Sequence, residues 1–153
     1  MTVRLYAMTC GWLSMPMRVV LDGEEGELRM PVPSYLIDHP KGHVLFDSGL
    51  HTEMQHPTSE RMTFLAKRFK SEFRAGEELG ARLERCDVDV NKVRYLINSH
   101  LHFDHAGGNH QVKNAQLVVQ QREWQAAHDA DLIQANGFAP EDYDHGHDLN
   151  LVD

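Results

Sequence analysis

The most informative stretch of the sequence is a run of potential metal ligands, His100, His102, Asp104 and His105. In an extended segment, His100 and His102 project to the same side. Asp104 and His105 follow where paired glycines, at 107 and 108, permit a tight turn. Imidazole and carboxylate ligands suit zinc or a similar first-row divalent ion. Packing alone gives no reason to crowd these groups together, so the run predicts a metal centre.

Several regular elements must position this run. The expected strands cover residues 3–8, 34–38, 43–47, 93–98 and 116–119. The strand at 93–98 leads directly into His100. The four residues from His39 to Gly42 fit a type I turn, which predicts a hairpin between the second and third strands.

Helical spacing of apolar residues predicts three helices. They cover residues 59–73, 77–85 and 121–136. Gly137 is placed to end the last of them, and Leu151 to Asp153 resembles the start of another strand. The mixture of strands and helices along the chain predicts an α/β fold.

The ligand run resembles the H-x-H-x-D-H motif of the metallo-β-lactamase superfamily. Within it, the segment from Ser99 to Asn109 closely resembles the N-acyl-homoserine lactonases. Leu45 to Gly49 is similar to the family's strand followed by Asp-x-Gly. The resemblance covers nearly the whole chain and implies a metallo-β-lactamase-type αββα sandwich with the metals at one edge of its two sheets.

The resemblance also implies an activity and a set of roles. The activity is metal-dependent opening of the lactone ring of N-acyl-homoserine lactones, and hence quorum quenching. His100 and His102 would bind one metal, and Asp104 and His105 the second. The metals would be zinc, or cobalt, manganese or iron, and would activate water and polarise the lactone carbonyl.

Three residues receive further roles on the same ground. Asp104 would help to protonate the leaving alkoxide. Asp47 would steady the ligand loop from behind, although a strand-end cap explains it equally well. Phe103, between the ligands, would contact the acyl chain or the lactone ring, and buried packing is its alternative role.

Family members are considerably longer than this chain, and their later segments supply further ligands. The resemblance therefore implies that residues 1–153 are a single metallo-β-lactamase-like domain, truncated at its C-terminus. We expect this chain alone to bind metal weakly and to have little lactonase activity. Two alternatives stay open: a thioester or ester hydrolase of the glyoxalase II type, and an inactive metal-binding fragment.

The remaining histidines are expected not to be ligands. His145 and His147 are two residues apart, but the stretch around them is polar and acidic, which indicates a solvated loop. The others are scattered singly, and His110 is the nearest of them to the ligand run.

Composition limits the partners and the compartment. The formal net charge is −8, without a basic run, which argues against nucleic acid and anionic membranes as partners. No apolar run is long enough to span a bilayer, and the N-terminus lacks the apolar region of a signal peptide. Two distant cysteines, Cys10 and Cys86, indicate thiols in a reducing compartment. We therefore expect a cytoplasmic protein with a small lactone substrate, and homo-oligomerisation is possible.

Overall fold

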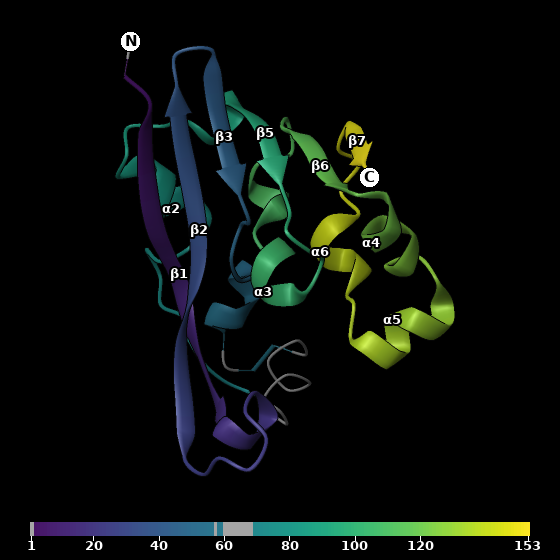
Figure 1. The fold of residues 1–153 in the computed structure, drawn as a ribbon. Coiled ribbons are helices and arrows are strands. Elements are labelled where there is room, and N and C mark those ends of the chain that lie inside the picture. The colour runs from purple at the N-terminus through teal and green to yellow at the C-terminus, as the bar shows by residue number, and fades with distance from the viewer. Residues whose placement is uncertain (1, 57, 60–68) are drawn as a thin grey trace.

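The computed structural model describes residues 2–56, 58–59 and 69–153, and its strands form one mixed sheet. In spatial order the sheet runs β4-β1-β2-β3-β5-β6-β7 (Figure 1). The strands are β1 (Arg4–Pro16), β2 (Glu27–His39), β3 (Gly42–Phe46), β4 (Lys70–Glu72), β5 (Val93–Ile97), β6 (Gln116–Gln120) and β7 (Leu149–Val152). Pairing is antiparallel among β4, β1, β2 and β3, and parallel from β3 through β7. The expected α/β class is confirmed, and the described residues contribute one sheet of the expected sandwich.

Short helices connect the strands. The α-helices are α2 (Leu79–Glu84), α3 (Phe103–Ala106), α4 (Gln121–Ala126), α5 (Ala130–Asn136) and α6 (Pro140–Tyr143). Single 3-10 turns are η1 (Met17–Val19), η2 (Thr52–Gln55), η3 (Val90–Lys92) and η4 (Asn109–Gln111). Within the described ranges, no helix is both long and apolar enough to cross a membrane.

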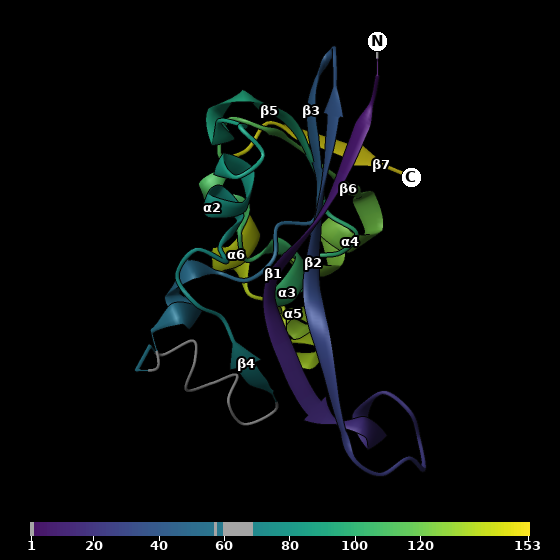
Figure 2. The same cartoon turned by 90° about the vertical axis from the view of Figure 1, so that its left-hand side faces the viewer.

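The main core lies on one face of the sheet. Side chains alternate along each strand, so Met8, Leu36 and Leu45 are buried together with Leu79 and Leu83 of α2. Figure 2 shows α2 and α6 on the same side of β1, β2 and β3. The intervening residues of these strands point to the opposite face of the sheet.

Two of the three expected helices need revision. The first was expected over residues 59–73, and residues 60–68 of it lie outside the described part of the chain. Its end, Lys70–Glu72, is the strand β4, which pairs with residues 12–14 of β1. This long-range pairing overrides the local helical spacing, while Phe73 still packs into a core cluster with Leu13.

The helix expected over residues 121–136 is divided into α4 and α5. The break falls at Asp129, whose carboxylate accepts hydrogen bonds from the backbone N–H groups of Asp131 and Leu132 and so begins a new helix. Gly137 ends α5 in a left-handed conformation, as expected. The hairpin at residues 39–42 and the strands β3, β5 and β6 are confirmed close to their expected bounds.

Candidate metal centre

The ligand run lies where two neighbouring parallel strands end. β3 and β5 are hydrogen-bonded in parallel, so the residues after each strand emerge at the same edge of the sheet. Asp47 follows β3, and Ser99 and His100 follow β5. Figure 1 shows α3 at the end to which the arrowheads of β3 and β5 point. The parallel pairing of β3 and β5 therefore brings together residues 52 positions apart, Asp47 and Ser99.

Three of the expected ligands converge. Ligand atoms of His100, Asp104 and His105 all lie within 4.8 Å of one another, and all three residues are half-buried. The rings of His100 and His105 have centroids 3.9 Å apart, and His105 Nε2 lies 3.4 Å from Asp104 Oδ2. Among the described residues, no other group of three such side chains meets this distance.

The fourth expected ligand, His102, flanks this group. Its ring centroid lies 4.7 Å from that of His100, edge to face, and 5.3 Å from that of Phe138. His102 is not one of the three residues whose ligand atoms converge. The expected pairing of His100 with His102 on one ion, and of Asp104 with His105 on another, stays a prediction.

The buried carboxylate of Asp47 supports the ligand loop. Its Oδ1 accepts from the Ser99 N–H at 2.8 Å, and its Oδ2 accepts from the Ser99 hydroxyl at 2.8 Å. His105 Nδ1 also lies 2.8 Å from Oδ2. With Nδ1 held in this way, Nε2 of His105 faces Asp104 and the cluster. A carboxylate behind an imidazole is the usual support of a metal-binding histidine, so these residues fit a divalent ion.

Charge and burial act against each other in the cluster. Burial lowers the pKa of His105, but its hydrogen bonds to Asp104 and Asp47 and their charges outweigh burial and raise it to about 9. Burial raises the pKa of Asp104, yet the contact with His105 brings it below its usual value. Burial and the neighbouring imidazoles lower the pKa of His100. The group thus holds a carboxylate among imidazoles, as a cation site requires.

Two glycines let the loops on either side of the cluster touch. A Cβ on Gly108 would lie 2.2 Å from the Ser48 carbonyl oxygen, and one on Gly107 would lie 2.4 Å from the His51 nitrogen. Neither distance is possible between real atoms, so only glycine fits at either position. The loop after β3 therefore packs backbone to backbone against the segment that follows the ligands.

Sequence reasoning missed three buried polar residues beside the cluster: Ser48, Asn98 and Asn109. They are hydrogen-bonded to one another and to the backbone of His105. Asn98 and Asn109 directly flank the ligand segment in the sequence. Their position was the only available signal, since burial arises from the approach of the loop after β3.

Phe103 is nearly buried, with 9% of its surface exposed. It packs in a cluster with Leu13, Val32 and Leu50, and its ring lies 5.5 Å from that of Phe69. This geometry supports the packing alternative. The contact with substrate stays a prediction, and it would involve the small part of the side chain that is exposed.

The expectation of a solvated loop at residues 145–147 is wrong for His147. That side chain is buried, with 8% of its surface exposed, and burial lowers its pKa. The loop folds back because β7 joins the sheet beside β6 directly after it. His145 stands between this residue and His110, with ring centroids 6.1 and 6.0 Å away.

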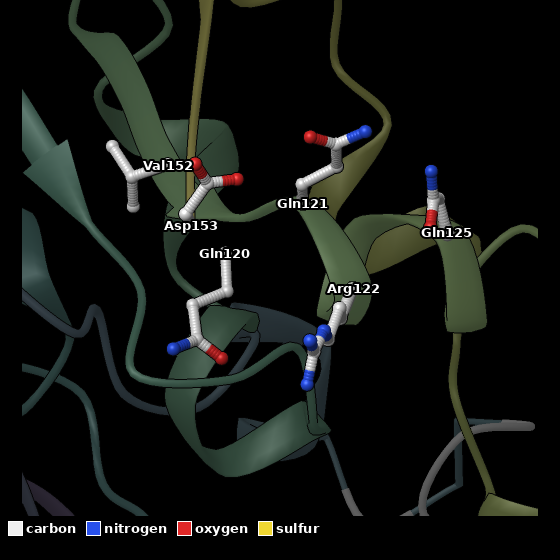
Figure 3. Close-up of a pocket in the computed structure, with 6 residues that line it drawn as sticks. All are labelled: Gln120, Gln121, Arg122, Gln125, Val152 and Asp153. Atoms are coloured by element: carbon white, nitrogen blue, oxygen red, sulfur yellow. The ribbon is translucent and has the colours of Figure 1, made fainter.

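A surface pocket lies elsewhere on the molecule (Figure 3). It is lined by Gln120, Gln121, Arg122, Gln125, Val152 and Asp153. None of these is a predicted site residue, and apart from Val152 the lining consists of amide and charged side chains around the end of β6, in α4 and at the end of β7. The candidate chemistry therefore lies at the ligand cluster.

The comparisons with known proteins agree with this geometry. Residues 29–146 match the model of the metallo-beta-lactamase superfamily, so the chain belongs to that superfamily. It is 30% identical over 144 residues to N-acyl homoserine lactonase AttM of Azorhizobium caulinodans, covering 93% of this chain and 55% of that protein. It is 32% identical over 101 residues to N-acyl homoserine lactonase AiiA of Bacillus thuringiensis subsp. kurstaki, covering 65% of this chain and 40% of that protein.

Solved structures give the same result. An N-acyl homoserine lactone hydrolase, with the product N-hexanoyl-L-homoserine bound at its catalytic metal centre, aligns with a TM-score of 0.83 at 26% identity. The alignment covers all of this chain and 61% of that one. The dizinc quorum-quenching lactonase AidC aligns with a TM-score of 0.68 at 14% identity, covering 99% of this chain and 58% of that one, which supports the fold alone. The chain spans about half the length of the curated relatives it matches.

Proposed function

We propose that this protein is a metal-dependent hydrolase that opens the lactone ring of N-acyl-homoserine lactones, and so quenches quorum signals. The observation that carries the proposal is the convergence of His100, Asp104 and His105, with Asp47 behind His105. The similarity of the chain to proteins named N-acyl homoserine lactonases supports the choice of substrate.

The metal group is proposed as two divalent ions, with zinc as the first choice and cobalt, manganese or iron as alternatives. His100 and His102 are proposed for one ion, and Asp104 and His105 for the other. When bound, such ions lower the pKa of water and polarise a carbonyl oxygen. The residues present fit this group, because Nε2 of His105 and a carboxylate oxygen of Asp104 face the same space.

The chain's own residues would divide the remaining work. Asp104 is the proposed proton carrier for the leaving alkoxide, since its carboxylate lies 3.4 Å from Nε2 of His105 and is partly exposed. Asp47 is proposed to hold His105 in one orientation through Nδ1. Phe103 is proposed to offer its exposed edge to the acyl chain or lactone ring.

Residues 1–153 are proposed to form a single metallo-β-lactamase-like domain, and the substrate is proposed to be a small molecule. The proposed compartment is the cytoplasm. Two free cysteines, one buried and one partly buried, support a reducing environment.

The test combines metal content with a substrate panel. The purified protein is loaded with zinc and assayed on N-hexanoyl-L-homoserine lactone and on a glutathione thioester. We expect zinc to bind weakly and lactone opening, although slow, to exceed thioester cleavage. Both zinc binding and hydrolysis should be abolished by His100→Ala combined with His105→Ala. His128→Ala is the matched control, because His128 is exposed and contacts Trp124 instead of the cluster.

Each outcome has a defined meaning. Preferential thioester cleavage would replace the lactonase proposal with a hydrolase of the glyoxalase II type. Zinc binding without turnover of either substrate would favour a metal-binding fragment. Unchanged zinc binding in the double variant would reject the cluster as the metal site.

A further inference from the structure

We infer that Ser48, Asn98 and Asn109 form a buried network that positions His105 for metal binding by holding its backbone carbonyl group. These three residues are called the carbonyl network below. The inference rests on the proposed metal centre and deepens it, since none of the three side chains belongs to the ligand cluster.

Three donors surround the carbonyl oxygen of His105. The Ser48 N–H donates to it at 2.7 Å, and the Asn98 amide Nδ2 donates to it at 3.1 Å. The Ser48 hydroxyl lies 3.0 Å away. A backbone carbonyl has two lone pairs, so the two nitrogen donors alone can satisfy it.

The remaining bonds close the network and fix both amide orientations. The Ser48 hydroxyl has a single proton, and its shorter contact is the 2.7 Å bond to Asn109 Oδ1. It accepts from the Gly108 N–H at 3.0 Å. Asn109 Nδ2 then donates to Asn98 Oδ1 at 2.8 Å, which leaves the Asn98 amide nitrogen to face His105. Each member therefore determines the orientation of the next.

Burial makes this network stiff. Ser48 and Asn109 are 0% exposed, and Asn98 is 3% exposed. In such surroundings a polar group without its partner is costly, so the bonds are held closely. The network also joins three segments, because Ser48 follows β3, Asn98 follows β5 and Asn109 begins η4.

The ligand helix needs such support. α3 is four residues long, and a helix of one turn is not stable by itself in water. His105 is held at two points: Asp47 contacts its ring at Nδ1, and the carbonyl network holds its backbone. Asp47 alone would leave the ring tethered to a mobile main chain, whereas both together fix where Nε2 points.

The test measures zinc affinity by competition with a chelating dye, on the full chain and five variants. Asn98→Ala and Asn109→Ala are made singly and together, and Ser48→Ala is the milder variant because it keeps the Ser48 N–H bond to His105. Val93→Ala is the matched control. It is buried in β5, with 2% of its surface exposed, but lies at the opposite end of that strand from Asn98.

We expect each asparagine variant to bind zinc with an affinity at least about 10-fold lower, because a metal ligand that loses its supporting hydrogen bonds binds the ion less tightly. The double variant should lose less than the product of the two single effects, because both act through one network. The visible absorption spectrum of bound cobalt should change in the same variants. Val93→Ala should lower the urea midpoint of unfolding without changing zinc affinity or the cobalt spectrum.

Two results would overturn the inference. One is wild-type zinc affinity in folded asparagine variants, and the other is an affinity loss in Val93→Ala equal to theirs, which would make the effect one of general stability. If an asparagine variant does not fold, Ser48→Ala decides by the same criteria. Failure of the unmutated chain to bind zinc would instead overturn the proposed metal centre, and this inference with it.

Discussion

His105 shows how one side chain depends on the atoms behind it. Its Nδ1 faces the Asp47 carboxylate, which can only accept, so the Nδ1 proton is retained. The raised pKa of His105 keeps a second proton on Nε2, beside Asp104, and a metal ion would bind Nε2 by displacing that proton. Asp47 holds this place with a backbone φ of 57°, a left-handed conformation that aspartate tolerates better than most residues. Position 47 therefore needs a residue that tolerates a left-handed backbone and carries a negative charge.

This arrangement makes Asp47→Asn informative. The amide keeps the size of the side chain, and its oxygen can still accept from the Ser99 N–H, but its nitrogen would then face His105 Nδ1. The imidazole would have to place its proton on Nε2, toward the metal. We expect zinc affinity to fall about 10- to 100-fold, measured by calorimetric titration.

The control for this change is Asp38→Asn. Asp38 is another strand-end carboxylate, but it pairs with Arg4 at a different part of the sheet. It should bind zinc like the unmutated protein. Equal zinc affinity in the Asp47 and Asp38 variants would contradict the role assigned to Asp47.

A second prediction at this scale concerns the thiols. Burial raises the pKa of Cys10 to about 12, and the thiolate is the reactive form. Between pH 7 and pH 9 Cys10 should stay protonated and unreactive. We expect a disulfide reagent to modify one thiol, Cys86, in the folded protein and both after unfolding in urea.

Cys86→Ser provides the check on that assignment, since the folded variant should then show no rapid reaction. Prompt modification of two thiols in the native protein would show that the packing around Cys10 is looser than described.

At the scale of elements, the loop after β3 packs closely against β1. Gly49 has a φ of 79°, and a Cβ there would lie 2.3 Å from Cys10 Cβ. Gly137 has a similar φ of 73° at the end of α5, but a Cβ there would meet nothing within 4 Å. The two positions share a backbone conformation and differ in the space available.

Alanine at these positions should separate the two effects. Gly137→Ala should cost about 1 kcal/mol, the price of a left-handed alanine. Gly49→Ala should cost roughly 1–3 kcal/mol more, because the collision must displace β1 or the loop. Urea denaturation measures both, and equal losses would contradict the close packing of the loop after β3 against β1.

The elements close to the site were predictable because their signals are local. The strands β5 and β6 are rich in apolar residues, and the ligand segment between them is a continuous motif. The strand β4 was not predictable, since its partner in β1 is about sixty residues away. Ser48, Asn98 and Asn109 were missed for the same reason: a polar residue outside a strand or long helix is ordinarily solvated, and only the assembled loops bury these three.

At the scale of the whole molecule, the sheet has one covered and one open face. Leu5, Tyr35 and Phe46 share a face, because Ala7 pairs with Tyr35, Tyr35 with Phe46, and Leu5 lies two residues before Ala7. All three are exposed. Contiguous apolar surface of this kind favours association.

We therefore predict concentration-dependent self-association, measured by sedimentation velocity. Leu5→Lys combined with Phe46→Lys should weaken it by placing charges on the open face. Leu132→Lys is the control, because Leu132 is equally apolar and 41% exposed but lies on α5. A monomer at every concentration, or the same effect from the control, would contradict the prediction.

The span of the contacts around the candidate centre has a kinetic consequence. Asp47 meets Ser99 and His105 across 52 and 58 positions, and Ser48 meets Asn109 across 61. The entropy of closing such large loops is lost before the contacts can stabilise the fold. We therefore expect these contacts to form late as the chain folds. Zinc added to refolding protein should accordingly be captured with the slowest phase, so the timing of capture would report when the last strands meet.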